Sequence, residues 1–184
     1  MKKVAVFGNA GGGKSTLARQ LSEISGLPLH SLDLVQFRQG RYWAGEENGG
    51  KIPHDEYLKI HAELLTQSQW IIDGYGCVAS AWERFSAADT LVYIDLPVLT
   101  HYWRVTKRLI QGTYRNPTGW PEHSPVWSST LDSYRVIWRC HGRLTPRYRQ
   151  LVLDVSFSKR VYHLQSPAQM RAFLTAIKHE QRNW

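Results

Sequence analysis

The sequence predicts an α/β fold in which helices cover both faces of a parallel β-sheet. Segments typical of buried strands alternate with segments of helical periodicity along the whole chain, which is the signature of a doubly wound fold. A glycine-rich stretch joins the first strand to the first helix. The 184 residues, 42% of them hydrophobic, suit a packed core, so we expect residues 1–184 to form a single domain.

The first strand is expected at residues 4–7, a short continuous apolar run of the kind that forms a buried parallel strand. From Ser15 onward apolar residues recur at helical spacing, and Gly26 stands where the residue after a helix belongs. The order is therefore a strand, a glycine loop and a helix.

The remaining elements follow in alternation. Four more strands are predicted at residues 28–33, 69–74, 90–97 and 159–164. Helices are predicted at residues 53–68, 98–111 and 128–143, and after 165, where Ser166 caps and Pro167 begins the helix. Residues 112–127 are rich in Gly and Pro and have no periodicity, which indicates a loop.

The glycine loop "GNAGGGKS" matches the phosphate-binding pattern GxxxxGK[ST]. Without Cβ atoms, its backbone can turn N–H groups toward phosphates at a helix N-terminus, whose dipole favours anions. We expect Lys14 to reach the β- and γ-phosphates and Ser15 to offer its hydroxyl to Mg²⁺. The predicted nucleotide-binding residues are Gly8, Asn9, Ala10, Gly11, Gly12, Gly13, Lys14, Ser15 and Thr16.

A carboxylate is also needed to hold Mg²⁺ or its waters, and two predicted strands end in one. We favour Asp73, because Gly74 and Gly76 allow a ligand to approach closely. Asp95 precedes Pro97 and could cap the following helix. The predicted metal residues are therefore Ser15 and Asp73.

Asp33 is a third carboxylate at the end of a predicted strand, that of residues 28–33, at the sheet edge where ligands of open α/β folds gather. It could accept the proton of an attacking hydroxyl or orient it. The alternative is a turn residue that bonds its own backbone.

The formal net charge of +8 is concentrated in residues 101–150, which hold nine cations and two acids. Eight of the nine are Arg, whose planar fork suits phosphate, although a basic solvated face is the alternative. Arg104 and Arg108 lie on the helix at 98–111. Arg135, Arg139 and Arg143 would share one face of the next helix, where at least one could point at the phosphates, and Arg139 is a candidate.

Aromatic residues interleave with these cations, as in proteins that stack nucleic-acid bases. Trp103 and Trp138, however, fall at apolar helical spacing, where core packing is the commoner reason. Nucleic acid is therefore a partner that we do not favour.

Four stretches resemble the adenylate-kinase-like kinases of nucleotides and small molecules: "GNAGGGKS", "LHSLDLVQFR", "WIIDGYG" and "ADTLVYIDLP", the last followed by "HYWRVTKRLIQGTYR". The sequence is most similar to a bacterial subgroup labelled adenylate kinase or DNA topology modulation protein. The resemblance implies a three-layer sandwich around a five-stranded parallel sheet in the order 2-3-1-4-5, with the strand ending in Asp73 beside the P-loop strand. It also implies a lid at about 112–127 that carries Arg115. Adenylate kinases have "DGFPR" where this chain has "DGYGCVAS", so AMP is not indicated as the acceptor.

We therefore expect Mg²⁺-dependent transfer from ATP to an unidentified small-molecule acceptor. The alternative is a nucleotide-binding regulator whose basic face contacts DNA or a protein. No apolar run approaches the roughly 20 residues of a membrane span, the apolar stretch near the N-terminus is too short for a signal peptide, and the two cysteines form no metal-binding spacing. A cytoplasmic protein without a membrane partner is expected.

Overall fold

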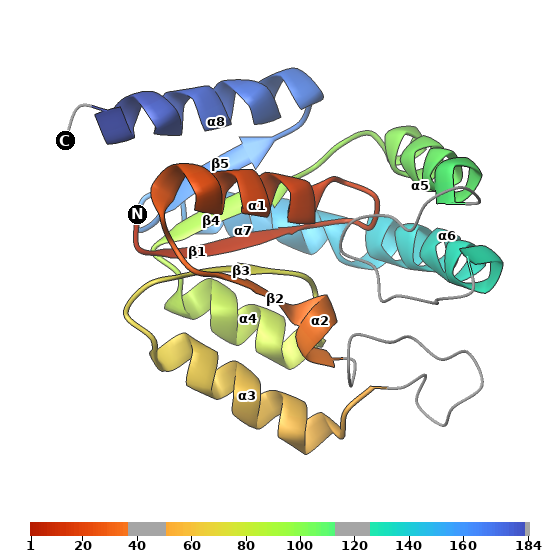
Figure 1. The fold of residues 1–184 in the computed structure, drawn as a ribbon, viewed down its shortest axis with the longest axis horizontal. Coiled ribbons are helices and arrows are strands. Elements are labelled where there is room, and N and C mark those ends of the chain that lie inside the picture. The colour runs from red at the N-terminus through yellow and green to blue at the C-terminus, as the bar shows by residue number, and fades with distance from the viewer. Residues whose placement is uncertain (37–50, 113–125, 183–184) are drawn as a thin grey trace.

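The computed structural model describes residues 1–36, 51–112 and 126–182. Its centre is one all-parallel sheet in the order β2-β3-β1-β4-β5 (Figure 1). The strands are β1 (Lys3–Gly8), β2 (Leu29–Ser31), β3 (Trp70–Asp73), β4 (Thr90–Ile94) and β5 (Arg160–Leu164). This order confirms the predicted topology, and it makes β1 the central strand.

Helices lie on both sides of this sheet and beyond the ends of its strands (Figure 1). They are α1 (Lys14–Ser25), α2 (Leu32–Gln36), α3 (His54–Thr66), α4 (Val78–Ala87), α5 (Val98–Gly112), α6 (Val126–Arg143), α7 (Thr145–Asp154) and α8 (Pro167–Arg182). None of the helices in the described ranges combines the length and the apolar character that crossing a bilayer requires.

The two faces of the sheet bury separate hydrophobic clusters. Val4 and Val6 of β1 pack in a cluster with residues of α1 and α8, such as Leu21 and Ile177. The alternate residues of the strand, including Phe7, pack in a cluster with residues of α3, α4 and α7. Successive side chains of a strand point to opposite faces, so a strand buried on both faces is continuously apolar, as residues 4–7 are.

Phe7 connects the glycine loop to a cluster of aromatic rings in this core. Its ring centroid lies 4.3 Å from that of Phe85, 5.0 Å from that of Tyr93 and 5.1 Å from that of Tyr148. Aromatic pairs at such distances stabilise a core beyond simple area burial. Because Phe7 immediately precedes Gly8, the loop starts from a well-packed anchor.

The sequence-based elements are largely confirmed, with three omissions. The five strands lie where they are predicted, within a few residues, and the backbone N–H of Gln169 donates to Ser166 Oγ at 3.2 Å, as expected for the cap of α8. Helices α2, α4 and α7 were not predicted. Pro146 follows the end of α6 and stands in the first turn of α7, where its missing N–H has no helical partner to lose.

Candidate active site

The glycine loop leaves the end of β1 and needs glycine at several positions. Gly8 has φ 142°, and a Cβ there would overlap the carbonyl oxygen of Ile94 on the neighbouring strand β4. Gly11 has φ 71°, and its Cβ would lie 2.9 Å from Val105 Cγ2 of α5. Positive φ and close backbone packing together explain why the loop is rich in glycine.

Two side chains of α5 and a backbone carbonyl of α6 hold the loop in place. The ring Nδ1 of His101 lies 2.7 Å from the carbonyl oxygen of Ala10, and Arg104 Nη1 donates to that of Gly12 at 2.8 Å. From the loop itself, Asn9 Nδ2 donates to the carbonyl oxygen of Ile137 in α6 at 3.0 Å. These contacts fix the loop without a bound ligand.

His101 acts in this arrangement as a neutral donor. Burial lowers its pKa, and the nearby charges of Lys14 and Arg104 lower it further. Since a carbonyl oxygen only accepts, Nδ1 carries the proton in the bond to Ala10.

Lys14 and Ser15 occupy the first turn of α1. Lys14 Nζ donates to the carbonyl oxygen of Asn9 at 3.0 Å, so its charge is folded back onto the loop. Gly13 provides no side-chain cap to the helix, and Ser15 and Thr16 are exposed. The first turn of α1 therefore has backbone N–H groups open to an anion.

Asp73 ends β3 beside this turn, in register with Val6 of β1. Its side chain is 1% exposed and is hydrogen-bonded by Ser15. Burial raises the pKa of Asp73, while the charge of Lys14 and the bond from Ser15 counteract the rise. Its Oδ1 has no hydrogen-bond partner in the described part of the chain, which leaves an acceptor oxygen for the water shell of a cation.

The described residues contain no group of three or more His, Cys, Asp and Glu side chains that could hold a metal ion by themselves. Proteins bind Mg²⁺ through one or two carboxylates together with substrate phosphates and waters. Ser15 and Asp73 fit such a site.

Asp95 is committed to other partners. Arg149 donates to both of its carboxylate oxygens, at 2.8 and 3.1 Å, and His163 Nε2 lies 2.9 Å from Oδ2. These partners hold the pKa of Asp95 below its ordinary value, although burial opposes them. Asp95 thus serves as the centre of an ion-pair cluster where the sequence suggested a helix cap, and Asp73 is the aspartate with an unused oxygen.

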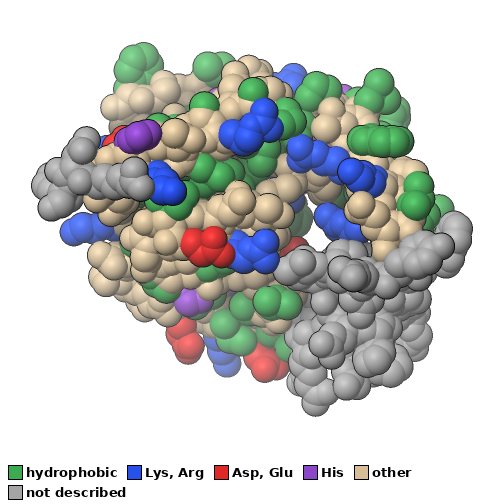
Figure 2. Space-filling view, turned by 45° about the horizontal axis from the view of Figure 1, so that its top comes forward, with side chains coloured by type: hydrophobic (Ala, Val, Ile, Leu, Met, Phe, Trp, Pro, Cys, Tyr) green, Lys and Arg blue, Asp and Glu red, His purple; other side chains and the backbone are tan. Residues whose placement is uncertain are grey.

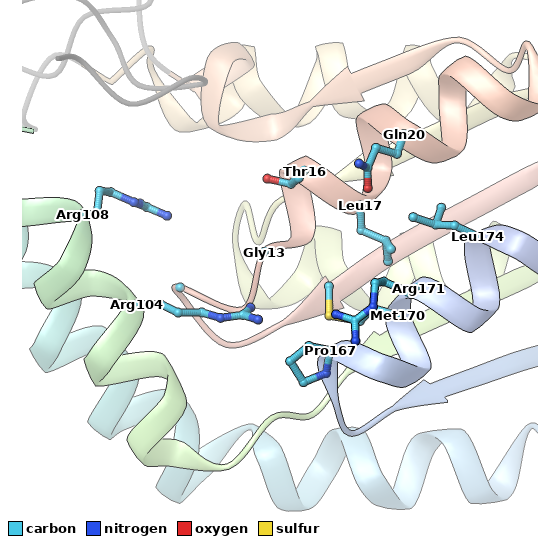
Figure 3. A pocket seen from close by; sticks show the side chains of 11 residues that line it. Gly13, Thr16, Leu17, Gln20, Arg104, Arg108, Pro167, Met170, Arg171 and Leu174 are labelled. Carbon is cyan, nitrogen blue, oxygen red and sulfur yellow. The ribbon is translucent and has the colours of Figure 1, made fainter. Parts of the chain in front are cut away.

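One cavity opens on the α1 side of the loop, and we name it the α1–α8 pocket (Figure 3). It has a volume of about 350 Å³. Arg104 and Arg108 extend into it from α5, opposite Pro167, Met170 and Arg171 of α8 (Figure 3). The two arginines are predicted from the sequence as site residues, whereas the residues of α8 are not. Their position just after β5, at the ligand-binding edge of a parallel sheet, was the available signal.

A second, larger cavity of about 890 Å³ lies on the other side of the loop, and we name it the α6 cavity. Lys14 and Asp33 line it together with the arginines of α6 and α7, namely Arg139, Arg143 and Arg147. Figure 2 shows Lys and Arg side chains gathered around a hollow in one face of the molecule. Arg139 thus lines the same cavity as Gly8, Ala10 and Lys14 of the glycine loop and the helix after it, and its contact with phosphate stays a prediction.

The other predicted cations are placed differently. Arg135 of α6 pairs with Asp132 at 3.0 Å and is not among the residues that line the α6 cavity. Arg115 lies outside the described residues, as does most of the predicted lid, so their roles stay predictions. Trp103 and Trp138 are 65% and 71% exposed, so assigning them to the core was wrong.

The loop after β3 is held by a residue that the sequence analysis missed. Arg84 of α4 is fully buried, and its Nη2 donates to the carbonyl oxygens of Gly74 at 3.0 Å and Tyr75 at 3.4 Å. An ideal Cβ on Gly74 would lie 3.3 Å from Asp33 Oδ1. Arg84 therefore fixes the loop that follows Asp73 and carries Tyr75, and Gly74 of that loop lies beside Asp33.

No protein-family model matches the sequence, and no curated protein matches it. Solved structures do. A shikimate kinase from Acinetobacter baumannii, in complex with shikimate, is 18% identical with a TM-score of 0.56, and the match covers 100% of this chain and 94% of that one. A shikimate kinase from Bacteroides thetaiotaomicron is 13% identical with a TM-score of 0.55, and the match covers 97% of both chains.

The chain has the α/β P-loop kinase fold. At this level of identity the likeness concerns the fold, and function has to be argued from the site. The P-loop fold and the parallel sheet place Gly8, Lys14, Ser15 and Asp73 together as the sequence predicted.

Proposed function

We infer that this protein is an ATP-dependent phosphotransferase that moves the γ-phosphate of Mg·ATP to a small-molecule acceptor. The observation that carries the proposal is the position of the glycine loop between two cavities. Gly11, Gly13 and Thr16 line the α1–α8 pocket, and Gly8, Ala10 and Lys14 line the α6 cavity. A nucleotide whose phosphates lay on the loop would face an acceptor in the second cavity.

The α1–α8 pocket suits the nucleoside part of the donor. Its volume of about 350 Å³ is at the small end for ligand pockets, and apolar side chains such as Leu17 and Met170 stand beside the guanidinium groups of Arg104 and Arg108. A guanidinium plane can stack on a base or grip a phosphate. The choice of ATP as the nucleotide rests on the adenylate-kinase-like resemblance. This choice is the more specific part of the proposal.

Ser15 and Asp73 would hold Mg²⁺, which when bound offsets charge on the phosphates and orients them. The chain's own residues do the rest. Lys14, now bonded to the carbonyl oxygen of Asn9, would turn to the phosphates and carry its charge to the oxygens that gain electron density.

Asp33 is the candidate that handles the proton of the acceptor. It is exposed and lines the α6 cavity with Lys14, so a bound hydroxyl could donate to its carboxylate while approaching the phosphate. Arg108 interacts electrostatically with Asp33. Burial lowers the pKa of the Arg108 guanidinium, and the negative charge of Asp33 counteracts that shift.

Calorimetry with Mg·ATP and Mg·ADP tests the donor half of this proposal. We expect saturable binding to the wild type that weakens at least about tenfold in Lys14→Ala, since a charged hydrogen-bond donor to phosphate is removed. Release of ADP, coupled to a colour reaction, then measures turnover with candidate acceptors. Failure of the wild type to bind either nucleotide would refute the proposal.

The exposure of Trp103 and Trp138 on α5 and α6 supports a second candidate, a nucleotide-binding regulator that contacts DNA or a protein. Titration of the Mg·ADP-loaded protein with a single-stranded oligonucleotide separates the two. Quenching of Trp fluorescence at moderate salt, without turnover of any acceptor, would favour the regulator.

A further inference from the structure

The α6 cavity carries a strong excess of positive charge. Lys14, Arg139, Arg143 and Arg147 line it, and among the lining residues that the structure describes Asp33 is the one acidic residue. Like charges gathered around a concave site raise the local concentration of anions and steer them into it. The cavity is therefore built to receive a negatively charged molecule.

Within the described residues, the arginines of this cavity differ from neighbouring arginines in making no side-chain hydrogen bond or ion pair. In the described part of the chain, the guanidinium groups of Arg139, Arg143 and Arg147 have no hydrogen bond or ion pair to another side chain. Elsewhere on α6 and α7, Arg135 pairs with Asp132 at 3.0 Å and Arg149 with Asp95 at 2.8 Å. Arginines that serve stability are thus paired in this part of the molecule, and those of the cavity are left for a ligand.

Their arrangement also suits one small group. Arg139 and Arg143 are four residues apart on α6, so they project from the same face of the helix, and Arg147 follows in the first turn of α7. Arg147 stands close enough to Tyr75 to act on the pKa of its hydroxyl, which burial raises. Guanidinium groups bind carboxylate and phosphate in the same forked, bidentate manner.

The cavity is too large and too apolar for an inorganic ion alone. Its volume of about 890 Å³ lies in the range of about 300–1,000 Å³ for organic ligands. Val78, Val136 and Leu144 contribute apolar walls, and the ring of Tyr75 is 37% exposed beside them. Such walls pack against carbon atoms, so the anionic group belongs to an organic molecule.

We propose that the acceptor is a hydroxylated organic anion, whose carboxylate or phosphate is held by Arg139, Arg143 and Arg147 while its hydroxyl faces Asp33 and Lys14. This proposal rests on the proposed function. In the transfer, the hydroxyl oxygen of the acceptor forms a bond to the γ-phosphorus of ATP. The bond from that phosphorus to the β–γ bridging oxygen breaks, its electron pair leaves on ADP, and the hydroxyl proton passes to Asp33.

The experiment compares anionic and neutral hydroxyl compounds on protein saturated with Mg·ADP or Mg·ATP. The carboxylate pairs are shikimate with its methyl ester and gluconate with glucose. The phosphate pairs are glycerol 3-phosphate with glycerol and AMP with adenosine. Calorimetry on the Mg·ADP complex measures binding, and coupled ADP release with Mg·ATP measures turnover. Occupying the loop with nucleotide keeps the probes out of the P-loop itself.

We expect an anionic probe to bind at least about tenfold more tightly than its neutral partner, and Arg143→Ala and Arg139→Ala to remove about tenfold to a hundredfold of that affinity. Arg135→Gln is the matched control on the same helix. It should change neither the affinity for the anionic probe nor its preference over the neutral partner. Whether the carboxylate or the phosphate pair responds identifies the anionic group.

Three results would overturn the inference. One is a neutral probe that binds better than its anionic partner, and another is the absence of binding by every anionic probe to protein that does bind Mg·ADP. The third is an Arg143→Ala variant that loses nucleotide affinity but keeps anion affinity, since the arginines would then serve ATP. If Mg·ADP itself did not bind, the proposed function would fail instead, so the two failures are distinguishable.

Discussion

Arg149 holds both carboxylate oxygens of Asp95, while Asp73 keeps one oxygen without a partner among the described residues. Asp73 ends β3 and Asp95 follows β4, the two strands that flank β1 in the sheet. Asp95 therefore supports the fold, whereas Asp73 is the aspartate that we propose for the ligand.

The first prediction tests this division. Asp73→Asn should lower kcat by about 10- to 100-fold, because it removes charge from the group that we propose to orient Mg²⁺. Its stability should hold or rise, since a buried carboxylate with a raised pKa is replaced by a neutral amide. Asp95→Asn should instead lower the free energy of unfolding by about 1–3 kcal/mol through loss of the Arg149 and His163 contacts. Steady-state kinetics and urea unfolding of both variants decide, and the opposite ranking of kcat would contradict the assignment.

The second prediction concerns Lys14. Its Nζ donates one hydrogen bond to the carbonyl oxygen of Asn9, at 3.0 Å. Without nucleotide, the Lys14→Ala variant should therefore be only slightly less stable than the wild type. Turnover of an accepted substrate should fall at least about 10²-fold, since a charge that acts on the transferring phosphoryl group is removed. Arg19→Ala, which changes an exposed cation on the same helix, is the control and should retain full turnover.

The third prediction concerns the buried pair of His61 and Arg84. Nε2 of His61 lies 3.5 Å from Arg84 Nη1, and burial together with that charge lowers the pKa of His61 to about 4. The carboxylate of Glu83 lies 3.7 Å from Nδ1, but it is 61% exposed and screened by solvent. His61 should therefore stay neutral at neutral pH.

Since the unfolded chain binds the proton near pH 6.5 and the folded chain only near pH 4, the contribution of His61 is present above pH 6.5 and is lost as the pH falls toward 4. Between pH 7 and pH 5 this amounts to about 2 kcal/mol. The free energy of unfolding of His61→Gln should lack that part of the pH dependence, because Gln keeps an acceptor but does not titrate. Parallel curves for the two proteins would disprove it.

The fourth prediction separates backbone strain from steric overlap at glycine. Gly26 and Gly76 have nearly equal φ, 71° and 70°, but a Cβ on Gly26 meets nothing within 4 Å, whereas one on Gly76 would overlap the Tyr57 hydroxyl. Gly26→Ala should destabilise by about 1–2 kcal/mol, and Gly76→Ala by about 1–3 kcal/mol more. Tyr57→Phe should restore part of the loss in the Gly76→Ala background. Urea unfolding of the four proteins measures these differences.

Much of the site was predictable because its parts are contiguous. The residues from Gly8 to Thr16 interact through backbone geometry, which the spacing of glycines already encodes, and the apolar runs of β1, β3 and β4 indicate their burial. The resemblance supplied the strand order and thereby placed Asp73 next to the loop.

The rest depends on contacts that sequence spacing does not encode. In the sequence, the fully buried Arg84 cannot be distinguished from a solvent-exposed arginine of an amphipathic helix. The pair of Asp95 and Arg149 joins residues that are 54 positions apart. Helix α5 has apolar residues on more than one face, and Val105 is buried against the glycine loop while Trp103 faces solvent. Periodicity alone does not tell which stripe packs inward.

Asn9 links the two halves of the site. Its side chain is almost fully buried, accepts from the N–H of Ala10 at 2.8 Å and donates to the carbonyl oxygen of Ile137 on α6 at 3.0 Å. The helix that carries Arg139 and Arg143 is thereby tied to the loop on which phosphates would lie. If the proposed acceptor shifts α6 when it binds, this link would change the nucleotide affinity of the loop, and thermodynamic reciprocity would require nucleotide to change acceptor affinity by the same factor. A single amide side chain would make the binding of the two substrates cooperative.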